Sequence, residues 1–206
     1  AAQSAFGNAV VTGTSTGYTI TGSNTGGLND SGDNMSGWFW DAGSAEVGSP
    51  SSSYDITPDK QWINNVCGFS ITKYTGNGTN NQSIPHGLTT GYDWLIVKKY
   101  EASGNDGTWM IDHIAVDGEN NIMILEQPET QRSGGLFYGY IDDPTDNNTF
   151  KVVTSGDSRH VNETGIDYIA YAFTSIPGFS KMGVYRGNGS TSGNFIYTGF
   201  RPKWLL

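Results

Sequence analysis

The chain carries one pattern twice, and this repeat limits the folds that it can adopt more than any other feature. The first copy, residues 68–97, reads Gly-Phe-Ser, then Tyr-Thr-Gly-Asn-Gly-Thr, then His-Gly-Leu, then Trp-Leu-Ile. The second copy, residues 178–206, reads Gly-Phe-Ser, then Tyr-Arg-Gly-Asn-Gly-Ser, then Thr-Gly-Phe, then Trp-Leu-Leu. The offset stays at about 110 residues and shifts slightly between motifs, as short loop insertions between equivalent strands produce. We therefore expect both Gly-Phe-Ser copies to occupy related strands.

The first copy predicts a strand, a tight turn and a second strand. Side chains alternate along a strand, so the odd-numbered residues of 69–74 face one side and the even-numbered residues face the other. The turn follows at Gly76-Asn77-Gly78, because Gly and Asn tolerate a left-handed backbone. The run Trp94-Leu95-Ile96-Val97 is continuously apolar, which favours a strand buried on both faces. We interpret the repeat as a packing and turn module rather than a binding motif.

Composition indicates an all-β protein. Gly is abundant with 29 residues, aromatic residues make up 13%, and charged residues only 15%. Gly-rich turns between aromatic and β-branched runs are typical of strands joined by short loops. We expect ten to twelve strands in an antiparallel β-sandwich, closer to a jelly roll than to an immunoglobulin-like domain.

The predicted organisation is a Gly/Ser/Thr/Asn-rich segment over residues 1–36 and a β-sandwich domain over residues 37–206. Residues 43–58, rich in Ser and Pro, predict a long loop. In Trp38-Phe39-Trp40 we expect a strand with one aromatic face in the core. Further strands are expected at 10–12, 18–20, 108–114, 121–125, 150–153 and 168–173, with an acidic turn at 142–148. Because the second copy of the repeat stops in mid-strand, we expect the chain to be part of a longer protein.

The order of these motifs resembles a known family. Gly-Phe-Ser, Tyr-x-Gly-Asn-Gly, His-Gly-Leu and Trp-Leu-Ile-Val-Lys are followed by Tyr168-Ile169-Ala170-Tyr171-Ala172-Phe173 and the second Gly-Phe-Ser. Over roughly residues 36–206 the chain is similar to an uncharacterised domain family of marine bacteriophage tail, fibre and other virion structural proteins. The resemblance implies a concanavalin-like jelly roll and a place in the virion. It implies no catalytic or ligand-binding residue.

Charge and composition also exclude classes of partner. The formal net charge is −9 and the sequence pI is about 4.6, which disfavours binding to nucleic acid or to anionic membranes. The only cysteine, Cys67, can form no disulfide within the chain, and we expect it to be a small buried residue. We expect no signal peptide, and the sequence has no apolar run long enough to cross a bilayer.

Patterns for catalysis and metal binding are weak. The run at 29–34 has the polar character of a calcium loop but lacks the bidentate Glu, so it predicts a turn. His86, His113 and His160 are scattered without the spacing of a metal site. A glycoside hydrolase needs two facing carboxylates, whereas Glu126 and Glu129 flank a proline in an expected loop. We expect no cofactor, no metal and no enzymatic activity, and we keep a glycosidase as the least favoured alternative.

Glycan binding makes smaller demands, since an aromatic face and a few polar groups are sufficient. The densest grouping of such residues lies in the middle of the chain: Trp109, Asp112, Tyr138, Tyr140, Asp142 and Asn147. These six residues are the candidate glycan site. The alternative is that the aromatic residues belong to the core and the acidic turn is solvated.

Two functions remain for a non-enzymatic virion protein. It is either an adhesin that binds host surface glycans, which we favour, or an assembly module that packs against copies of itself and other virion proteins. The second function predicts exposed apolar patches and a homo-oligomer.

Overall fold

The computed structural model describes residues 10–14, 16–21, 37, 39–43, 46–47, 54–100, 108–113, 121–125, 132–133, 140–142, 147–154 and 160–205. Of residues 10, 11, 46, 47, 121, 122, 132, 133 and 140–142 it describes the backbone alone. The chain divides into two compact units, residues 1–40 and residues 41–206. Each unit is treated by itself below.

The first unit contains a small hairpin. Strands β1 (Val10–Gly13) and β2 (Tyr18–Thr21), which the sequence predicted at 10–12 and 18–20, pair antiparallel. The expectation of a core strand at Trp38-Phe39-Trp40 is wrong. Phe39 and Trp40 lie outside any strand and are exposed, and Trp38 lies outside the described residues. The Phe39 ring instead packs on Tyr18 of the hairpin, with 4.8 Å between ring centroids.

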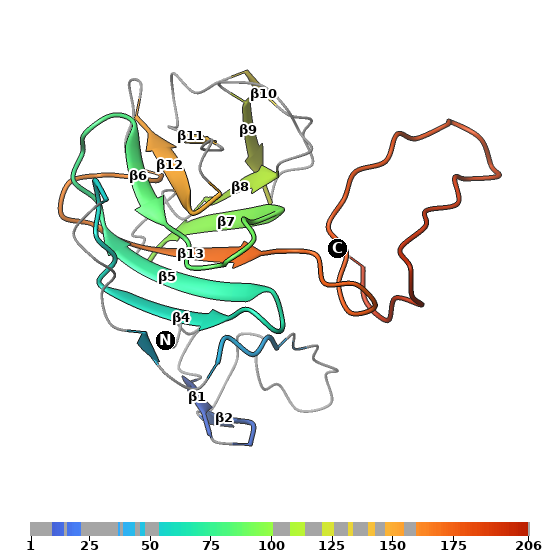
Figure 1. Cartoon of the computed structure of the whole chain (residues 1–206), viewed down its shortest axis with the longest axis horizontal. Coiled ribbons are helices and arrows are strands. Elements are labelled where there is room, and N and C mark those ends of the chain that lie inside the picture. Colours follow the sequence, from blue (N-terminus) through green and yellow to red (C-terminus); the bar gives the residue numbers. More distant parts are fainter. Residues whose placement is uncertain are drawn as a thin grey trace. The chain divides into compact units, whose positions relative to one another are not determined.

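The second unit is built from two antiparallel sheets (Figure 1). The larger sheet has the order β10-β9-β8-β7-β13-β5-β4-β3. Its strands are β3 (Glu46–Val47), β4 (Lys60–Asn64), β5 (Phe69–Thr75), β7 (Trp94–Lys99), β8 (Trp109–His113), β9 (Asn121–Ile124), β10 (Arg132–Ser133) and β13 (Asp167–Phe173). The smaller sheet has the order β11-β12-β6, with β6 (Gln82–Pro85), β11 (Tyr140–Asp142) and β12 (Thr149–Val153).

This arrangement confirms an all-β antiparallel sandwich, and the described ranges contain no helix. In that part of the chain there is accordingly no helix long and apolar enough to cross a membrane. Two details differ from the expectation. The short strand β3 interrupts the predicted loop at 43–58, and Asp142 belongs to β11 rather than to a turn. Cys67 is only partly buried, because it lies in the tight turn before β5 rather than in a strand.

Strand β13 is the centre of the large sheet. It pairs with β5 along all seven of its residues, from Asp167 opposite Thr75 to Phe173 opposite Phe69, and with β7 on its other side. The alternation predicted from the sequence is confirmed. Tyr168 and the alanines 170 and 172 lie in the core between the sheets, whereas Tyr171 and Phe173 belong to a second apolar cluster.

The core between the sheets is closed by two stacked tyrosines. The rings of Tyr74 and Tyr168 lie 5.3 Å apart, and Phe150 of β12 packs on the edge of Tyr74. Both hydroxyl groups are hydrogen-bonded: Tyr74 donates to the carbonyl of Val161 at 2.6 Å, and Tyr168 accepts from the amide of Glu163 at 2.9 Å. The pKa of the Tyr74 hydroxyl is raised well above its usual value, chiefly by burial. These bonds let large polar rings fill the core without unpaired groups.

Buried polar side chains join the two sheets at the other end of the core. The amide nitrogen of Gln61 on β4 donates to the carbonyl of Pro85 on β6 at 2.8 Å, and the hydroxyl of Ser70 on β5 donates to the carbonyl of His86 at 2.6 Å. Each bond crosses from the large sheet to the small one. Because such bonds are directional, they fix how the two sheets are placed on each other.

The two copies of the repeat differ in structure, so the expectation of equivalent strands is wrong. Phe69 lies in β5 and is only 4% exposed, whereas Phe179 lies in a turn and is 60% exposed. Tyr74 is fully buried, whereas Tyr185 is 70% exposed. The physical reason is the lack of neighbours: β5 lies between β13 and β4, whereas residues 181–205 pair with no strand of the described chain.

The repeat supplies a matched pair of substitutions. Phe69→Ala is expected to lower the free energy of unfolding by about 3–5 kcal/mol, because it leaves a cavity beside Phe173. Phe179→Ala is expected to change it by less than about 0.5 kcal/mol, since the ring is exposed. Urea unfolding of both variants measures the difference, and losses of equal size would show that both copies are packed.

Candidate binding face

The candidate site is the outer face, defined as the side of the large sheet that points away from β6 and β12. An apolar row crosses six neighbouring strands on this face, in direct register from β4 to β9. Its members are Trp62, Ile71, Tyr171, Ile96, Ile111 and Met123. All are partly exposed except Ile96, which is buried. The solvent side of an ordinary sandwich carries polar side chains instead.

An aromatic row lies beside the apolar row, toward the end of β13. The ring of Phe173 lies 4.7 Å from that of Phe69 and 5.1 Å from that of Trp94. Ala42 and Met182 pack against the same cluster. These rings come from three adjacent strands, β5, β13 and β7, so pairing in the sheet sets their spacing.

A third row on the other side carries most of the positive charge of the face. Lys98 and Trp109 are directly opposite each other on β7 and β8, and the Lys98 ammonium lies 4.5 Å from the centroid of the Trp109 ring. Trp109 also stacks on Tyr171 at 6.4 Å. A cation over an indole is attracted by the electron-rich ring face. This arrangement leaves Trp109 half-buried beneath the lysine side chain.

Lys73, in the same row, forms an ion pair with Asp167, with 2.6 Å between its ammonium and Oδ2 of the carboxylate. The hydrogen bond from Lys73 lowers the pKa of Asp167, and a hydrogen bond from the Thr75 hydroxyl lowers it further. The same hydrogen bond raises the pKa of Lys73. Both groups are charged at neutral pH, so this pair adds no net charge to the face.

The structure does not assemble the six predicted glycan-binding residues into one site. Trp109 lies on the outer face, but Asp112 turns inward and accepts a hydrogen bond from the Tyr92 hydroxyl at 2.6 Å. A spacing of three along a strand puts two side chains on opposite faces, which the prediction overlooked. Only backbone is described for Tyr140 and Asp142 in β11, and Tyr138 lies outside the described residues.

Asn147 has a structural role. Its backbone is left-handed, with φ of 56°, and its carbonyl lies 3.1 Å from Nε2 of the buried His86. Nδ1 of His86 accepts a hydrogen bond from the amide of Leu88 at 3.1 Å, so Nε2 carries the proton and donates to Asn147. These bonds hold the turn before β12 against the end of β6. Both ring nitrogens of His86 are therefore hydrogen-bonded within the core.

The other two histidines are separate from His86. His113 lies on the outer face at the end of β8, where burial lowers its pKa although the nearby Asp93 acts in the opposite direction. His160 is buried in the turn that precedes β13. Within the described residues, no three His, Cys, Asp or Glu side chains are placed to hold a metal ion.

Sequence reasoning missed the outer face as a site. The signal was the presence of large apolar residues on both faces of residues 94–97 and 168–173, which indicates layers on both sides of the sheet. The sequence identified the two faces of 168–173, but it could not show which of them lies between the sheets. Tyr171, Trp94 and Lys98 were therefore not considered as site residues.

The fold and this face define the class: an all-β sandwich domain with an apolar, partly exposed outer sheet face. The chain belongs to the family described as Domain of unknown function (DUF7483), whose family model matches residues 1–206. No curated protein matches the sequence. No solved structure matches the fold.

The pKa of Asp167 gives a prediction for acid stability. Its folded-state pKa lies below the usual 3.8, so the ion pair stabilises the fold above that pH and the contribution is lost as pH falls through the lower folded value. Asp167 is more than a third exposed, so solvent screening keeps the contribution under about 1 kcal/mol. Asp167→Asn should flatten the fall in stability below about pH 4. Unfolding curves at several pH values measure it, and an unchanged slope would contradict the assignment.

Proposed function

We propose that this chain is a structural protein of a bacteriophage virion and acts as an assembly module that packs against copies of itself and other virion proteins. The observation that carries the proposal is the apolar row on the outer face. Six apolar side chains in register across six strands form a surface of the kind that is covered in an assembly. The sequence resemblance to virion proteins supports the same class of function.

The types of side chain in the row favour a protein partner. A sugar site needs one or two aromatic faces surrounded by polar groups. Half of this row is aliphatic, and two of its three isoleucines, Ile71 and Ile111, are partly exposed. Aliphatic side chains on neighbouring strands match the apolar surface of another protein, and burying them is favourable at roughly 25 cal/mol per Å² of apolar area.

The finer fold assignment is also part of the proposal. Two facing antiparallel sheets, with β6 and β12 packed over β5, β13 and β7, are compatible with a concanavalin-like jelly roll. The virion is the location that follows from this function.

Glycan binding is a second candidate, supported by one observation. Trp109 and Tyr171 are stacked and partly exposed, and Lys98 lies over the indole. A sugar could stack beside these rings and bond to the ammonium. This site keeps Trp109 from the sequence prediction and replaces Asp112 with Tyr171 and Lys98.

The assembly function is tested by a charge placed in the apolar row. Ile111→Glu should leave the chain folded, because the side chain is partly exposed, with a loss in stability of about 1 kcal/mol. It should abolish incorporation into purified particles, measured by mass spectrometry of their proteins. Val66→Glu is the matched control, since Val66 is 84% exposed in the turn before β5. Absence of the unaltered chain from the particles, or normal incorporation of Ile111→Glu, would contradict the function.

The glycan candidate is tested by Trp109→Leu, which keeps an apolar side chain against Tyr171 but removes the aromatic face. Binding on an array of bacterial surface glycans should fall at least tenfold, while circular dichroism shows that the chain stays folded. Trp204→Leu, which alters a tryptophan that is 41% exposed, is the control. Undiminished binding by Trp109→Leu, or no binding by the unaltered chain, would rule this site out.

A further inference from the structure

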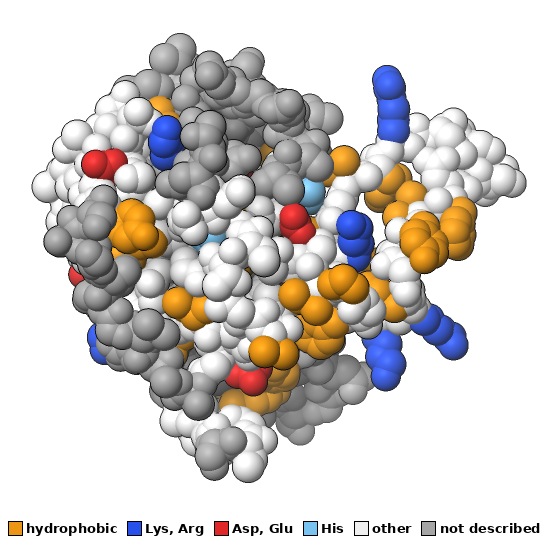
Figure 2. Space-filling model, viewed as in Figure 1, with side chains coloured by type: hydrophobic (Ala, Val, Ile, Leu, Met, Phe, Trp, Pro, Cys, Tyr) orange, Lys and Arg blue, Asp and Glu red, His pale blue; other side chains and the backbone are white. Residues whose placement is uncertain are grey.

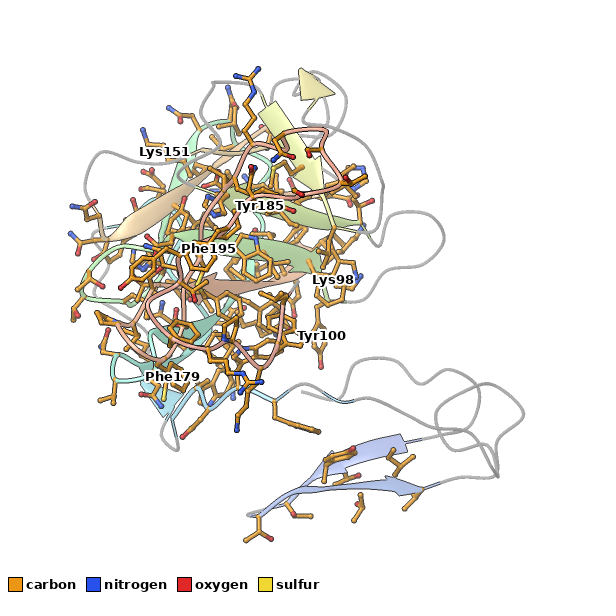
Figure 3. The ribbon with its side chains drawn as sticks, turned by 90° about the vertical axis from the view of Figure 1, so that its right-hand side faces the viewer. Lys98, Tyr100, Lys151, Phe179, Tyr185 and Phe195 are labelled. Atoms are coloured by element: carbon orange, nitrogen blue, oxygen red, sulfur yellow. The ribbon has the colours of Figure 1, made fainter. Side chains whose placement is uncertain are left out.

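The C-terminal arm, residues 181–205, exposes many large apolar side chains to solvent. It forms no strand, and its exposed large apolar residues are Val184, Tyr185, Phe195, Ile196, Tyr197, Trp204 and Leu205. Phe195 is 88% exposed. Figure 3 labels Tyr185 and Phe195 on this red segment. So many exposed aromatic and aliphatic groups in one segment mark a surface that another molecule covers.

The arm nevertheless keeps the turn geometry of the packed copy. In the first copy the amide of Thr79 donates to Oδ1 of Asn77 at 2.9 Å, and in the arm the amide of Ser190 donates to Oδ1 of Asn188 at 3.0 Å. The glycine that follows each asparagine has a left-handed backbone in both copies, with φ of 71° and 66°. The local shape is thus formed before packing, which lowers the entropy lost on docking.

What the arm lacks is the neighbours of the first copy. A side chain added at Gly78 would collide with the hydroxyl of Thr164, whereas the space around Gly189 is open. The amide of Asn77 is held by Oδ1 of Asn162, a buried residue from the turn before β13. No equivalent contact holds Asn188 in the described structure beyond the arm's own bonds.

Charge favours attraction between the arm and the rest of the chain. Residues 181–206 contain four of the eleven Lys and Arg residues and none of the twenty Asp and Glu residues, which gives +4. The first 180 residues therefore hold seven cations and twenty anions, which gives −13. Figure 2 shows blue side chains projecting from the C-terminal segment, which is otherwise orange and white. A cationic, aromatic arm and an acidic sandwich are complementary, so a second copy is a fitting partner.

The arm also starts at the outer face. The amide of Met182 donates to the Ser175 hydroxyl at 3.0 Å, and its side chain packs against the aromatic row of Phe69, Phe173 and Trp94. From this anchor the arm is long enough to cross a neighbouring face: extended, its residues span on the order of 75 Å, and six strands span roughly 25–30 Å. In a two-fold pair each arm can then cover the other copy's apolar row.

We propose that the C-terminal arm of one copy docks on the outer face of a second copy, with Tyr185, Phe195 and Tyr197 covering the apolar row. This inference rests on the proposed assembly function and names the segment that performs it. The arm's cations, chiefly Arg186 and Arg201, contribute through attraction to the acidic sandwich as a whole. Association should accordingly weaken as salt concentration rises.

The test measures association of the full chain by sedimentation velocity over a range of concentrations. Phe195→Ser combined with Tyr197→Ser, and separately Arg186→Glu combined with Arg201→Glu, should each weaken self-association at least tenfold. Val66→Ser, and Arg186→Lys combined with Arg201→Lys, should leave it near that of the unaltered chain. A chain that stays monomeric, or arm variants that associate normally, would overturn the proposal.

A second measurement separates docking on another copy from docking on the same copy. Equal amounts of ¹⁵N-labelled and unlabelled chain are mixed and treated with an amine cross-linker. Links between Lys203 and Lys98 or Lys60 should join labelled to unlabelled chains. If every such link stays within one chain, the proposal is overturned. If Ile111→Glu abolishes incorporation into particles while arm variants are incorporated normally, the assembly function stands and only the arm's role is lost.

Discussion

The antiparallel pairing of β13 with β5 and β7 is the interaction on which the rest of the structure depends. It joins residues about 70 to 100 positions apart in the chain and places two large aromatic sets on opposite sides of one strand. On one side Tyr168 stacks on Tyr74 and closes the core with the small sheet. On the other side Tyr171 and Phe173 form the centre of the outer face. One strand therefore determines both the core and the candidate site.

Because β13 is apolar on both sides, a two-layer sandwich leaves one of its faces incompletely covered. The outer face is only partly protected by its own packing, by Ala42 and Met182, and by the lysine side chains along its third row. The C-terminal arm also exposes large apolar side chains to solvent. Joining the arm of one copy to the face of another buries both, and the opposite charges of arm and sandwich favour that arrangement over pairing of two arms.

The sequence predicted the all-β class, strands at 69–74, 94–97, 108–114 and 168–173, and burial of residues 94–97 on both faces, because side-chain alternation is a local property. It did not predict that the second copy of the repeat lies outside any strand. The same Gly-Phe-Ser and Gly-Asn-Gly motifs form a buried strand and turn where β13 and β4 are present, and an exposed segment where no strand lies beside them. Strand formation depends on partners distant in sequence, which a motif does not encode.

The candidate site was predicted less well than the fold, for a similar reason. Of the residues predicted to bind a glycan, Trp109 lies on the outer face, but Asp112 points into the interior, where Tyr92 holds its carboxylate. Tyr171 and Lys98 meet Trp109 only through the pairing of β13, β7 and β8. Their positions in the sequence are too distant to reveal the contact.

Hydrogen–deuterium exchange of the full chain at low concentration tests the central claim most directly, because it compares the two copies within one molecule. The account predicts that amides of β5, β7 and β13 exchange only on global unfolding, whereas amides of the C-terminal arm exchange much faster, through local opening of its turns. Equal protection of residues 69–75 and 179–186 would contradict it, since both copies would then be packed strands.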